Sequence, residues 1–580
     1  MPIIKQRQYD LSDTQFTEAT PALLQQIYAA RGVLSDQDAQ HELKDLLPPQ
    51  LMKGWSQAAA IIADHIVQQK HILIVGDFDC DGATSSAVAV SALADMGAKF
   101  VDFLVPNRFE YGYGLTPEIV QVAKQKNPDL IITVDNGISS IDGVATANQL
   151  GIQVVVTDHH LAGQHLPEAA AIVNPNQPGC DFPSKNLAGV GVIFYVMSGV
   201  RAQLRERNWF ATNNIVEPNM AEYLDLVALG TVADVVPLDK NNRILVAQGI
   251  GRIRSGRVRP GIKALLEVAN RSLHRLVAAD FGFAIGPRLN AAGRLDDMSI
   301  GIQCLLAANE YSARELAQQM DELNHDRRAI ESGMQQEAMR SLAKISLDDS
   351  DMPYGLCLYQ ADWHQGVIGI LASRIKDHYH RPVIVFADAE DDGGPQQIKG
   401  SARSIVGLHI RDALDAVAAK HPHLLSKFGG HSMAAGMSLY KEHYPDFARA
   451  FDAEVRRQLS EDDLQAVLLT DGELSPQDFQ LELAQQLRDA GPWGQHFPEP
   501  LFEGELYLVQ QRIVGEKHLK LVLSTEPQGG QLIDAIAFNI DIKAWPNNAA
   551  KKAKLVYKLD VNEFRGNQSL QLMVDYIEAL

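Results

Sequence analysis

The chain has few cysteines and no long apolar run. Its four cysteines, Cys80, Cys180, Cys304 and Cys357, are widely spaced along 580 residues and form no Cys-x-x-Cys pair. This spacing argues against a zinc ribbon and against a disulfide framework, so we expect reduced thiols. No apolar stretch approaches the roughly 20 residues that span a bilayer, and residues 1–7 lack the apolar core of a signal peptide. We therefore expect a cytoplasmic protein with no membrane partner.

Basic residues are also scarce in comparison with acidic ones. The chain has 52 lysines and arginines against 72 aspartates and glutamates, a formal net charge of −20. This excess of negative charge argues mildly against a protein that coats nucleic acid non-specifically, although a local basic groove is compatible with it. The length is too great for one hydrophobic core and suggests three or four domains.

One apolar run ends in three aspartates at alternate positions. The run Ile72–Val75 is followed by Asp77, Asp79 and Asp81 and then by a helix-compatible segment, Ala83–Met96. This order predicts a parallel strand that turns into a crossover helix, with ligands bound beyond the carboxyl end of the strand. Three carboxylates on one turn are costly unless divalent cations neutralise them. A solvated acidic turn is the alternative that this pattern alone leaves open.

The alternation of strands and helices continues along the next 100 residues and predicts a doubly wound parallel sheet. The predicted strands cover residues 72–75, 100–105, 130–134, 154–156 and 170–173. We therefore expect an α/β fold in which the carboxyl ends of these strands share one edge of the sheet.

Polar residues follow two more of these strands. Asp135 follows the third, Asp158, His159 and His160 follow the fourth, and Asp234 closes a later apolar helical run. Taken singly, each aspartate could be a turn or helix-capping residue. Taken together, oxygen ligands with one or two histidines suit Mn²⁺ or Mg²⁺. Because the acids are too many for one ion, we expect two ions about 3.5–4 Å apart, bridged by one carboxylate.

The order and spacing of these residues resemble the DHH phosphoesterase superfamily, which includes manganese pyrophosphatases, small-nucleotide phosphodiesterases and the RecJ exonucleases. The resemblance implies two ligand sets that share a bridging carboxylate, Asp135. The first set is Asp77, Asp79 and Asp135, and the second is Asp81, Asp135, His159 and Asp234. Simpler members begin the first motif with a histidine, whereas this chain has Asp77, as RecJ-like sequences do.

The resemblance also implies catalytic roles for His160 and Asp158. His160 would face the substrate phosphate, and Asp158 would orient a histidine, as carboxylates commonly do beside metal-bound imidazoles.

Two segments rich in arginine follow the predicted sheet. Residues 251–259 carry four arginines, which fit either a phosphate-backbone contact or a solvated loop. Residues 283–294, FAIGPRLNAAGR, resemble the RecJ signature and not that of the small-nucleotide enzymes. By this resemblance, the substrate-binding candidates in the first half of the chain are Arg108, Arg288, Asn290 and Arg294.

The second half of the chain divides into three parts. Residues 312–347 predict one long connecting helix. Residues 352–460 predict a smaller α/β domain that resembles the DHHA1 domain. By this resemblance, Ser401 and Arg403, together with Arg288, would hold a terminal 5′-phosphate, and His431 would contact substrate near the metals. Residues 465–580 alternate apolar and polar side chains, which predicts a small β-barrel, OB-like by the resemblance.

With a helical N-terminal segment over 1–50 and a DHH catalytic domain over 51–311, the resemblance covers nearly the whole chain. It implies a metal-dependent 5′-to-3′ exonuclease that hydrolyses single-stranded DNA to 5′-mononucleotides in DNA repair and recombination. A single-strand-binding protein and a helicase would be its further partners. The alternatives are a phosphodiesterase for short oligoribonucleotides or cyclic dinucleotides, and a non-enzymatic nucleic-acid-binding factor. The arginine segments and the barrel argue against the first, and the complete ligand set against the second.

Overall fold

The computed structural model describes residues 2–106, 114–345, 352–389 and 396–580. The chain forms two compact units. One contains residues 6–321 and 469–580, and the other contains residues 1–5 and 322–468. In the described part of the chain, no helix has both the length and the apolar character needed to cross a membrane.

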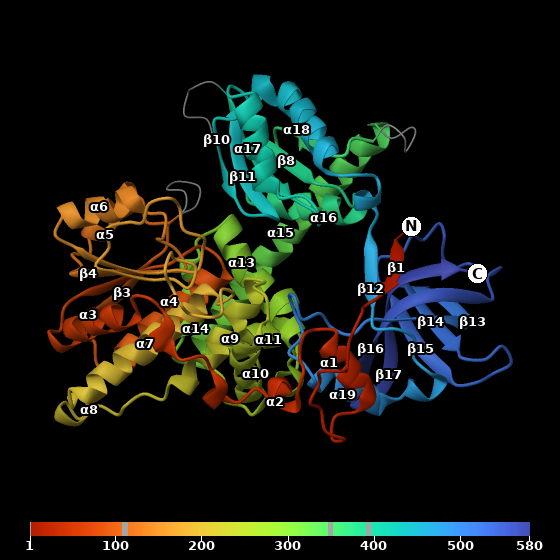
Figure 1. Cartoon of the computed structure of the whole chain (residues 1–580), viewed down its shortest axis with the longest axis horizontal. Coiled ribbons are helices and arrows are strands. Elements are labelled where there is room, and N and C mark those ends of the chain that lie inside the picture. Colours follow the sequence, from red (N-terminus) through yellow and green to blue (C-terminus); the bar gives the residue numbers. More distant parts are fainter. Residues whose placement is uncertain (1, 107–113, 346–351, 390–395) are drawn as a thin grey trace. The chain divides into compact units, whose positions relative to one another are not determined.

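The larger unit contains a five-stranded parallel sheet with the strand order β3-β2-β4-β5-β6 (Figure 1). The strands are β2 (Ile72–Val75), β3 (Val101–Leu104), β4 (Leu130–Val134), β5 (Gln153–Thr157) and β6 (Ala171–Val173). The three central strands are almost wholly buried, which explains why they read as continuous apolar runs. The predicted doubly wound sheet is confirmed.

Helices cover both faces of this sheet. One face packs with α5 (Pro117–Lys124) and α6 (Ile141–Gln149) in a core that includes Leu73, Ile131 and Val154. On the opposite side, as Figure 1 shows, lie the helices that include α3 (Trp55–Val67), α4 (Cys80–Asp95) and α7 (Gly189–Glu206). Strand β2 leads to β3 on one side, while β4 pairs with its other side. The chain therefore reverses its direction across the sheet between β2 and β4, which is where such folds bind ligands.

A group of helices follows the sheet in the same unit. Its elements are α8 (Trp209–Thr212), α9 (Leu224–Ala233), α10 (Lys240–Arg254), α11 (Pro260–Val268), α12 (Ala278–Asp280), a π-helical turn over Phe281–Ile285, α13 (Gly286–Leu295) and α14 (Ser299–Leu306). Helix α9 packs against α4 and α7, and Gly230 in its last turn lies beside Asp81.

The C-terminal part of this unit is a closed barrel with the strand order β13-β14-β15-β17-β16 (Figure 1). Its strands are β13 (Phe502–Val514), β14 (His518–Ser524), β15 (Leu532–Ala537), β16 (Lys552–Phe564) and β17 (Asn567–Ala579), and helix α19 (Leu481–Asp489) packs against β16 and β17. Strands β15 and β17 pair in parallel and the other neighbours are antiparallel. This is the five-stranded arrangement of an OB-fold.

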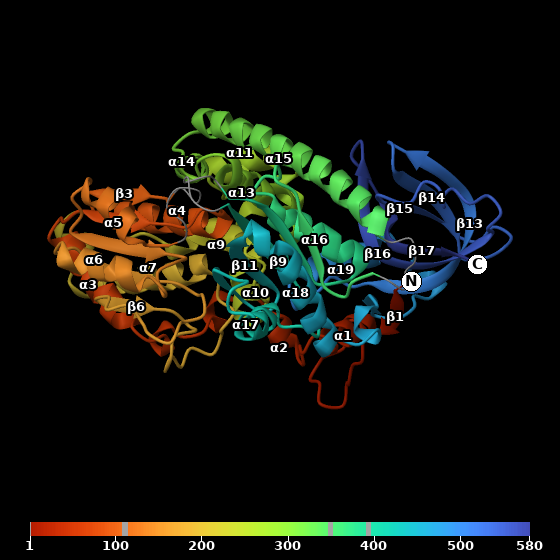
Figure 2. The ribbon, with the colours of Figure 1, turned by 90° about the horizontal axis from the view of Figure 1, so that it is seen from above.

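The smaller unit contains most of the long helix α15 (Glu310–Ile345), which is clear in Figure 2, and a mixed sheet. The sheet order is β10-β11-β9-β8-β7. Its elements are β7 (Leu356–Tyr359), α16 (Ile368–Tyr379), β8 (Val383–Asp388), β9 (Gln397–Arg403), α17 (Ile410–Lys420), β10 (Lys427–Gly430), β11 (Ala434–Tyr440) and α18 (Tyr444–Gln458). The glycine-rich segments near residues 400 and 430 lie largely within β9, β10 and β11, and two of their glycines, Gly400 and Gly430, have no room for a side chain. A methyl group at residue 400, for example, would lie 2.4 Å from the Phe386 ring.

The N-terminal segment is less helical than expected. It contains α1 (Ala22–Ala29), the short α2 (Asp36–Ala39), and two 3₁₀ turns over Leu43–Asp45 and Pro49–Leu51. It also contains a strand, β1 (Ile3–Gln6), which pairs with β12 (Val467–Thr470). The predicted helical segment therefore contains helices, but the strand was not predicted because its partner lies more than 450 residues further along the chain.

Candidate metal centre

The aspartate-rich turn joins β2 to α4 and presents three carboxylates in different ways. Asp77 is buried and its Oδ1 accepts a hydrogen bond from the Phe78 amide at 2.7 Å. Asp79 caps α4, because its Oδ1 accepts from the Gly82 amide at 3.0 Å. Asp81 lies in the first turn of the helix and is 1 % exposed.

Asp81 is held by the amino end of a second helix. Its carboxylate accepts hydrogen bonds from the amides of Gly189, at 2.7 Å, and Val190, at 2.9 Å, in the first turn of α7. Unpaired amides and the helix dipole favour a negative charge at this position. The orientation of Asp81 is therefore fixed from outside its own helix.

Asp135 follows β4 with a left-handed backbone, φ 61°, and is 1 % exposed. A non-glycine residue in this conformation is uncommon and is typical of constrained, functional positions. Gly189 packs directly behind it: a methyl group at residue 189 would lie 2.6 Å from Asp135 Oδ1. The missing side chain of Gly189 leaves the space that the Asp135 carboxylate occupies.

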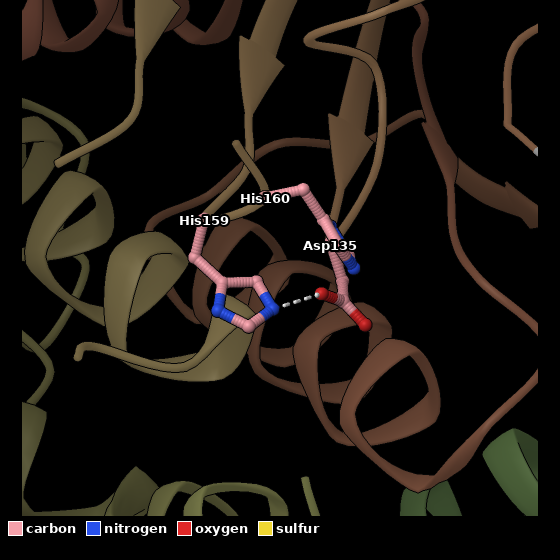
Figure 3. Close-up of side chains that lie close together, drawn as sticks. All are labelled: Asp135, His159 and His160. Atoms are coloured by element: carbon pink, nitrogen blue, oxygen red, sulfur yellow. Dashed lines mark ion pairs between the residues drawn. The ribbon is translucent and has the colours of Figure 1, made fainter. Parts of the chain in front are cut away.

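His159 joins two of the acidic groups. Its Nε2 lies 3.2 Å from Asp135 Oδ1 and 3.5 Å from Asp234 Oδ2, at the carboxyl end of α9. Figure 3 shows the imidazole of His159 directed at the Asp135 carboxylate. No hydrogen-bond partner of His159 Nε2 is found among the residues that the structure describes. A buried imidazole nitrogen of this kind is suited to bind a metal ion.

His160 is held by Asp158 instead. Its Nδ1 donates to Asp158 Oδ1 at 2.7 Å, and the same carboxylate accepts from the amides of Ile138, His159 and His160. Asp158 is 1 % exposed, whereas the His160 side chain is 31 % exposed. The histidine that Asp158 orients is therefore His160, whose ring faces the surface of the site.

Three groups of side chains have ligand atoms within 4.8 Å of one another. They are Asp77, Asp79 and Asp135; Asp81, His159 and Asp234; and Asp135, His159 and His160. The structure thus brings together all three side chains of the first predicted set and three of the four side chains of the second, and Asp135 lies beside that second group through its contact with His159. Their roles as metal ligands stay predictions. Carboxylates with one imidazole fit Mn²⁺ or Mg²⁺.

The electrostatics of the cluster favour cations. Burial raises the pKa of Asp135 well above its ordinary value, and the charge of Asp81 raises it further. Burial, together with neighbouring carboxylates, raises the pKa of Asp81 to about 7 and that of Asp234 to about 8. Because crowded buried carboxylates resist ionisation, a divalent ion stabilises their charged form.

The pKa values of the two histidines are shifted in opposite directions. Burial lowers the pKa of His159, and the nearby His160 lowers it further, which favours the neutral imidazole that binds metal. Burial alone would lower the pKa of His160, but the hydrogen bond to Asp158 and its charge raise it to about 9. These contacts with Asp158 favour the protonated form of His160.

The predicted substrate residues of the larger unit make internal contacts. Arg288 is 8 % exposed, and its Nε and Nη2 each lie 2.8 Å from Asp321 Oδ1. Asn290 Oδ1 accepts from the Cys80 amide at 2.7 Å. Arg294 lies in the last turn of α13, and Arg108 lies outside the described residues. Their substrate roles stay predictions.

Most arginines of the segment over residues 251–259 form ion pairs with acidic residues of the protein. Arg252 forms an ion pair with Glu222, Arg254 with Asp489, and Arg259 with Asp225. Two of these arginines lie in the last turn of α10, where cations are favoured by the helix dipole. Three of the four arginines are therefore paired within the protein, whereas Arg257 is exposed. A phosphate contact by this segment stays a prediction.

In the smaller unit, Ser401 and Arg403 lie together on β9. Arg403 Nη1 donates to Ser401 Oγ at 3.2 Å and to the Ala402 carbonyl at 2.8 Å. Burial lowers the pKa of the guanidinium. Gly369, in the first turn of α16, leaves room for both, since a methyl group there would lie 2.9 Å from Ser401 Oγ. His431 is exposed in the hairpin loop between β10 and β11.

Sequence reasoning missed the glycines that shape the metal centre. Gly189 packs against Asp135, and a methyl group at residue 230 would lie 2.2 Å from Thr84 Oγ1 and 2.9 Å from Asp81 Oδ1. A methyl group at residue 293 would lie 1.8 Å from the Phe78 carbonyl oxygen. Nothing in the local sequence distinguishes these glycines from those of ordinary helices, because their partners are distant in sequence.

Comparison with known families defines the class first. The model of the DHH family, N-terminal domain, matches residues 71–231, which contain the parallel sheet and all but Asp234 of the acidic and imidazole cluster. The DHHA1 domain matches residues 353–457 and the RecJ OB domain matches residues 470–576. The fold is thus that of a DHH protein with two added domains.

Individual proteins similar to this chain identify the family within the DHH class. The chain is 53% identical over 575 residues to the single-stranded-DNA-specific exonuclease RecJ of Dickeya dadantii, with 99% of each chain covered. It is 55% identical over 558 residues to that of Escherichia coli, covering 96% of each. The crystal structure of RecJ with Mn²⁺ from Thermus thermophilus matches with a TM-score of 0.77 and 28% identity, covering 96% of this chain and 76% of that one. The chain belongs to the RecJ family.

Proposed function

We propose that the protein is a metal-dependent exonuclease that degrades single-stranded DNA from the 5′ end and releases 5′-mononucleotides. The observation that carries this proposal is the cluster of acidic and imidazole ligands at the point where a RecJ-family sheet reverses its strand order. Membership of the family and the OB barrel support single-stranded DNA as the substrate. The metal-bound RecJ structures from Thermus thermophilus, one with Mn²⁺ and one with Mg²⁺, support the choice of ions.

We assign the ligands as two sets that share Asp135. Asp77, Asp79 and Asp135 hold one ion, and Asp81, Asp135, His159 and Asp234 hold the other. When bound, two divalent ions activate a water for in-line attack on phosphorus and neutralise charge on the phosphate. The attack breaks the bond between phosphorus and the 3′-oxygen of the terminal nucleotide, so that nucleotide leaves with its own 5′-phosphate.

Protein groups supply the remaining stabilisation. The hydrogen bond to Asp158 and its charge favour the protonated form of His160, raising its pKa to about 9, and the more exposed ring can donate a hydrogen bond to a phosphate oxygen. Asp158 holds that ring in one orientation through Nδ1. A fixed cationic donor costs no reorganisation when negative charge develops on the phosphate.

The other domains position the strand. We assign catalysis to residues 51–311, the link between lobes to 312–347, terminal-phosphate binding to 352–460 and strand binding to 465–580. In this assignment Ser401 and Arg403 hold the 5′-phosphate, and His431 contacts substrate near the ions. Arg108, Arg288, Asn290 and Arg294 act on the substrate side of the catalytic domain, where Arg288 must exchange its pairing with Asp321 for a phosphate.

Family membership also suggests the cellular setting. We propose that the protein acts in the cytoplasm in DNA repair and recombination. A helicase that opens duplexes and a single-strand-binding protein that covers the product strands are the partners such an activity needs.

The test uses long single strands labelled at either end. Strands of DNA and RNA are incubated with the full-length protein in Mn²⁺, Mg²⁺ or chelator, and products are resolved by length. The proposal predicts early release of the 5′ label as a mononucleotide from DNA, only with metal. Early release of a 3′ label, internal cuts, or equal activity with chelator would overturn it.

A further inference from the structure

One aromatic side chain beside the metal centre is exposed although its neighbours are buried. Phe283 is 80 % exposed, whereas Phe281 and Ile285 in the same π-helical turn are fully buried. Phe283 is also more exposed than Tyr311, Phe100 or Phe538. An aromatic ring normally buries a large area in the core, and π-helical turns are frequent at functional sites. The turn thus directs an apolar ring outward from a well-packed frame.

This turn packs on the helix end that carries Asp234. A methyl group at residue 286 would lie 3.2 Å from Ala233 Cβ, and one at residue 282 would lie 3.7 Å from Val232 Cγ1. The next residue after Asp234, Val235, has a left-handed backbone with φ 62° and is 61 % exposed. A β-branched residue in this conformation is strained. Two exposed apolar side chains therefore lie on adjoining turns at one metal ligand.

The helix that follows Phe283 is fastened to the other side of the metal centre. Asn290 of helix α13 accepts a hydrogen bond from the Cys80 amide, and Gly293 of the same helix lies directly against the Phe78 carbonyl. Residues 78 and 80 belong to the turn that presents Asp79 and Asp81. The element that carries Phe283 is thus anchored both to the turn with the first ligands and to the helix with the last one.

We propose that Phe283 stacks on a nucleobase of the strand whose scissile phosphate lies at the metal centre. The inference rests on the proposed nuclease function and adds a base contact to it. Stacking suits an enzyme that must act on any sequence, because every base has an apolar face. A base held at a fixed place relative to Asp234 sets the position of the phosphodiester along the strand, and so limits each cut to one register.

The experiment moves one abasic site through the strand. Single-stranded DNA carrying one abasic nucleotide at each of the first six positions from the attacked end is digested by wild-type protein, F283A and F283W. The matched control is F100A. Phe100 is also exposed, but it directly precedes β3 and so lies at the amino ends of the parallel strands, whereas the metal centre lies at their carboxyl ends. The first-turnover rate is measured at subsaturating DNA, and Mn²⁺-induced thermal stabilisation reports an intact metal centre.

The wild-type protein is expected to lose about 5- to 100-fold in rate when the abasic site occupies the stacked position, as base stacking on aromatic side chains typically contributes. F283A should show that loss on the intact strand and no further loss with the abasic site. F283W should restore the wild-type pattern, and F100A should behave as wild type. Mn²⁺ should stabilise all four proteins equally.

Two results would overturn the inference. One is full activity of F283A on intact DNA. The other is a loss in F283A that adds to the abasic effect at every position, which would indicate a packing role for the ring. Either result leaves the nuclease proposal standing, because the wild-type protein would still digest the strand. Failure of the wild-type protein to digest single-stranded DNA would instead remove the proposed function itself.

Discussion

The Nδ1 of His160 lies 2.7 Å from Asp158 Oδ1, while the adjacent imidazole of His159 points to Asp135. Two neighbouring histidines in one motif therefore have different surroundings. His159 is a buried ligand candidate between two carboxylates, and burial lowers its pKa and favours the neutral imidazole. His160 is more exposed, and its contact with Asp158 raises its pKa and favours the protonated form. Asp158 also accepts hydrogen bonds from three backbone amides, so its position does not depend on the histidine that it orients.

If Asp158 acts through His160, removing either side chain should lower kcat by about the same factor. We expect D158N and H160A each to lower kcat by about 10²–10³-fold, the range for losing one group that stabilises charge in a transition state. The double variant should be no slower than H160A, because the two residues act as a unit. Single-turnover digestion of single-stranded DNA measures this. If the two losses in rate multiply in the double variant, Asp158 has a role separate from His160. As a control for an intact metal centre, Mn²⁺-induced thermal stabilisation should persist in the two single variants and in the double variant.

Gly189 offers a test of how tightly the centre is packed. In G189A the new methyl group would lie within 2.8 Å of three atoms of Asp135. Because a displacement of about 1 Å can cost about 10²-fold in rate, we expect at least that loss, with weaker Mn²⁺ binding. G251A is the control, since residue 251 is an exposed helical position with no atom within 4 Å of the added methyl. It should keep full activity and gain about 0.5–1 kcal/mol in stability. Equal behaviour of the two variants would contradict the packing argument.

Arg403 should govern the preference for a phosphorylated end. We expect R403A to reduce the ratio of rates on 5′-phosphorylated and 5′-hydroxyl strands by about 10-fold or more, because charge-assisted hydrogen bonds to phosphate are strong. Activity on the 5′-hydroxyl strand should change little. R411A is the control, an exposed arginine on α17 of the same unit. An unchanged ratio in R403A would exclude this residue from the terminal-phosphate site.

A buried glutamate should make the smaller unit sensitive to acid. Glu454 is 2 % exposed and pairs with Arg457 and Lys420, and these contacts lower its pKa from 4.5 to about 2. Because the folded pKa is the lower one, this contribution to stability is complete above about pH 4.5 and is lost as the pH falls toward 2.

We expect E454Q to destabilise the unit by about 1–3 kcal/mol at pH 7, since it leaves two cations without their counter-charge. The difference from the wild-type protein should shrink below pH 4.5. Thermal unfolding between pH 7 and pH 3 measures both effects, with E461Q as an exposed control in the same unit. A difference that does not change with pH would contradict the assigned cause.

The parallel sheet and the cluster of acidic and imidazole side chains could be predicted from the sequence for one reason. Parallel strands are buried on both faces, so they appear as continuous apolar runs, and their carboxyl ends share one edge. Residues directly after such runs, such as Asp135 and His159, could therefore be placed together without knowledge of the fold. Asp234 needed the family resemblance, because it ends a helix whose position no local pattern reveals.

Features that depend on distant partners could not be predicted. The strand at Ile3–Gln6 pairs with residues far along the chain. Arg252 and Arg259 looked available for phosphates but are neutralised by Glu222 and Asp225. Arg288 is likewise paired with Asp321. In each case the local sequence gives the charge, whereas the tertiary fold supplies its partner.

We propose that Asp135 joins two metal ions in one centre. The most direct measurement is electron paramagnetic resonance of the protein titrated with Mn²⁺, compared with D135N under the same conditions. We expect the wild-type protein to bind two Mn²⁺ ions whose spins are coupled, and D135N to lose the coupling together with most of its nuclease activity. A wild-type protein that is fully active with a single uncoupled Mn²⁺ ion would contradict it.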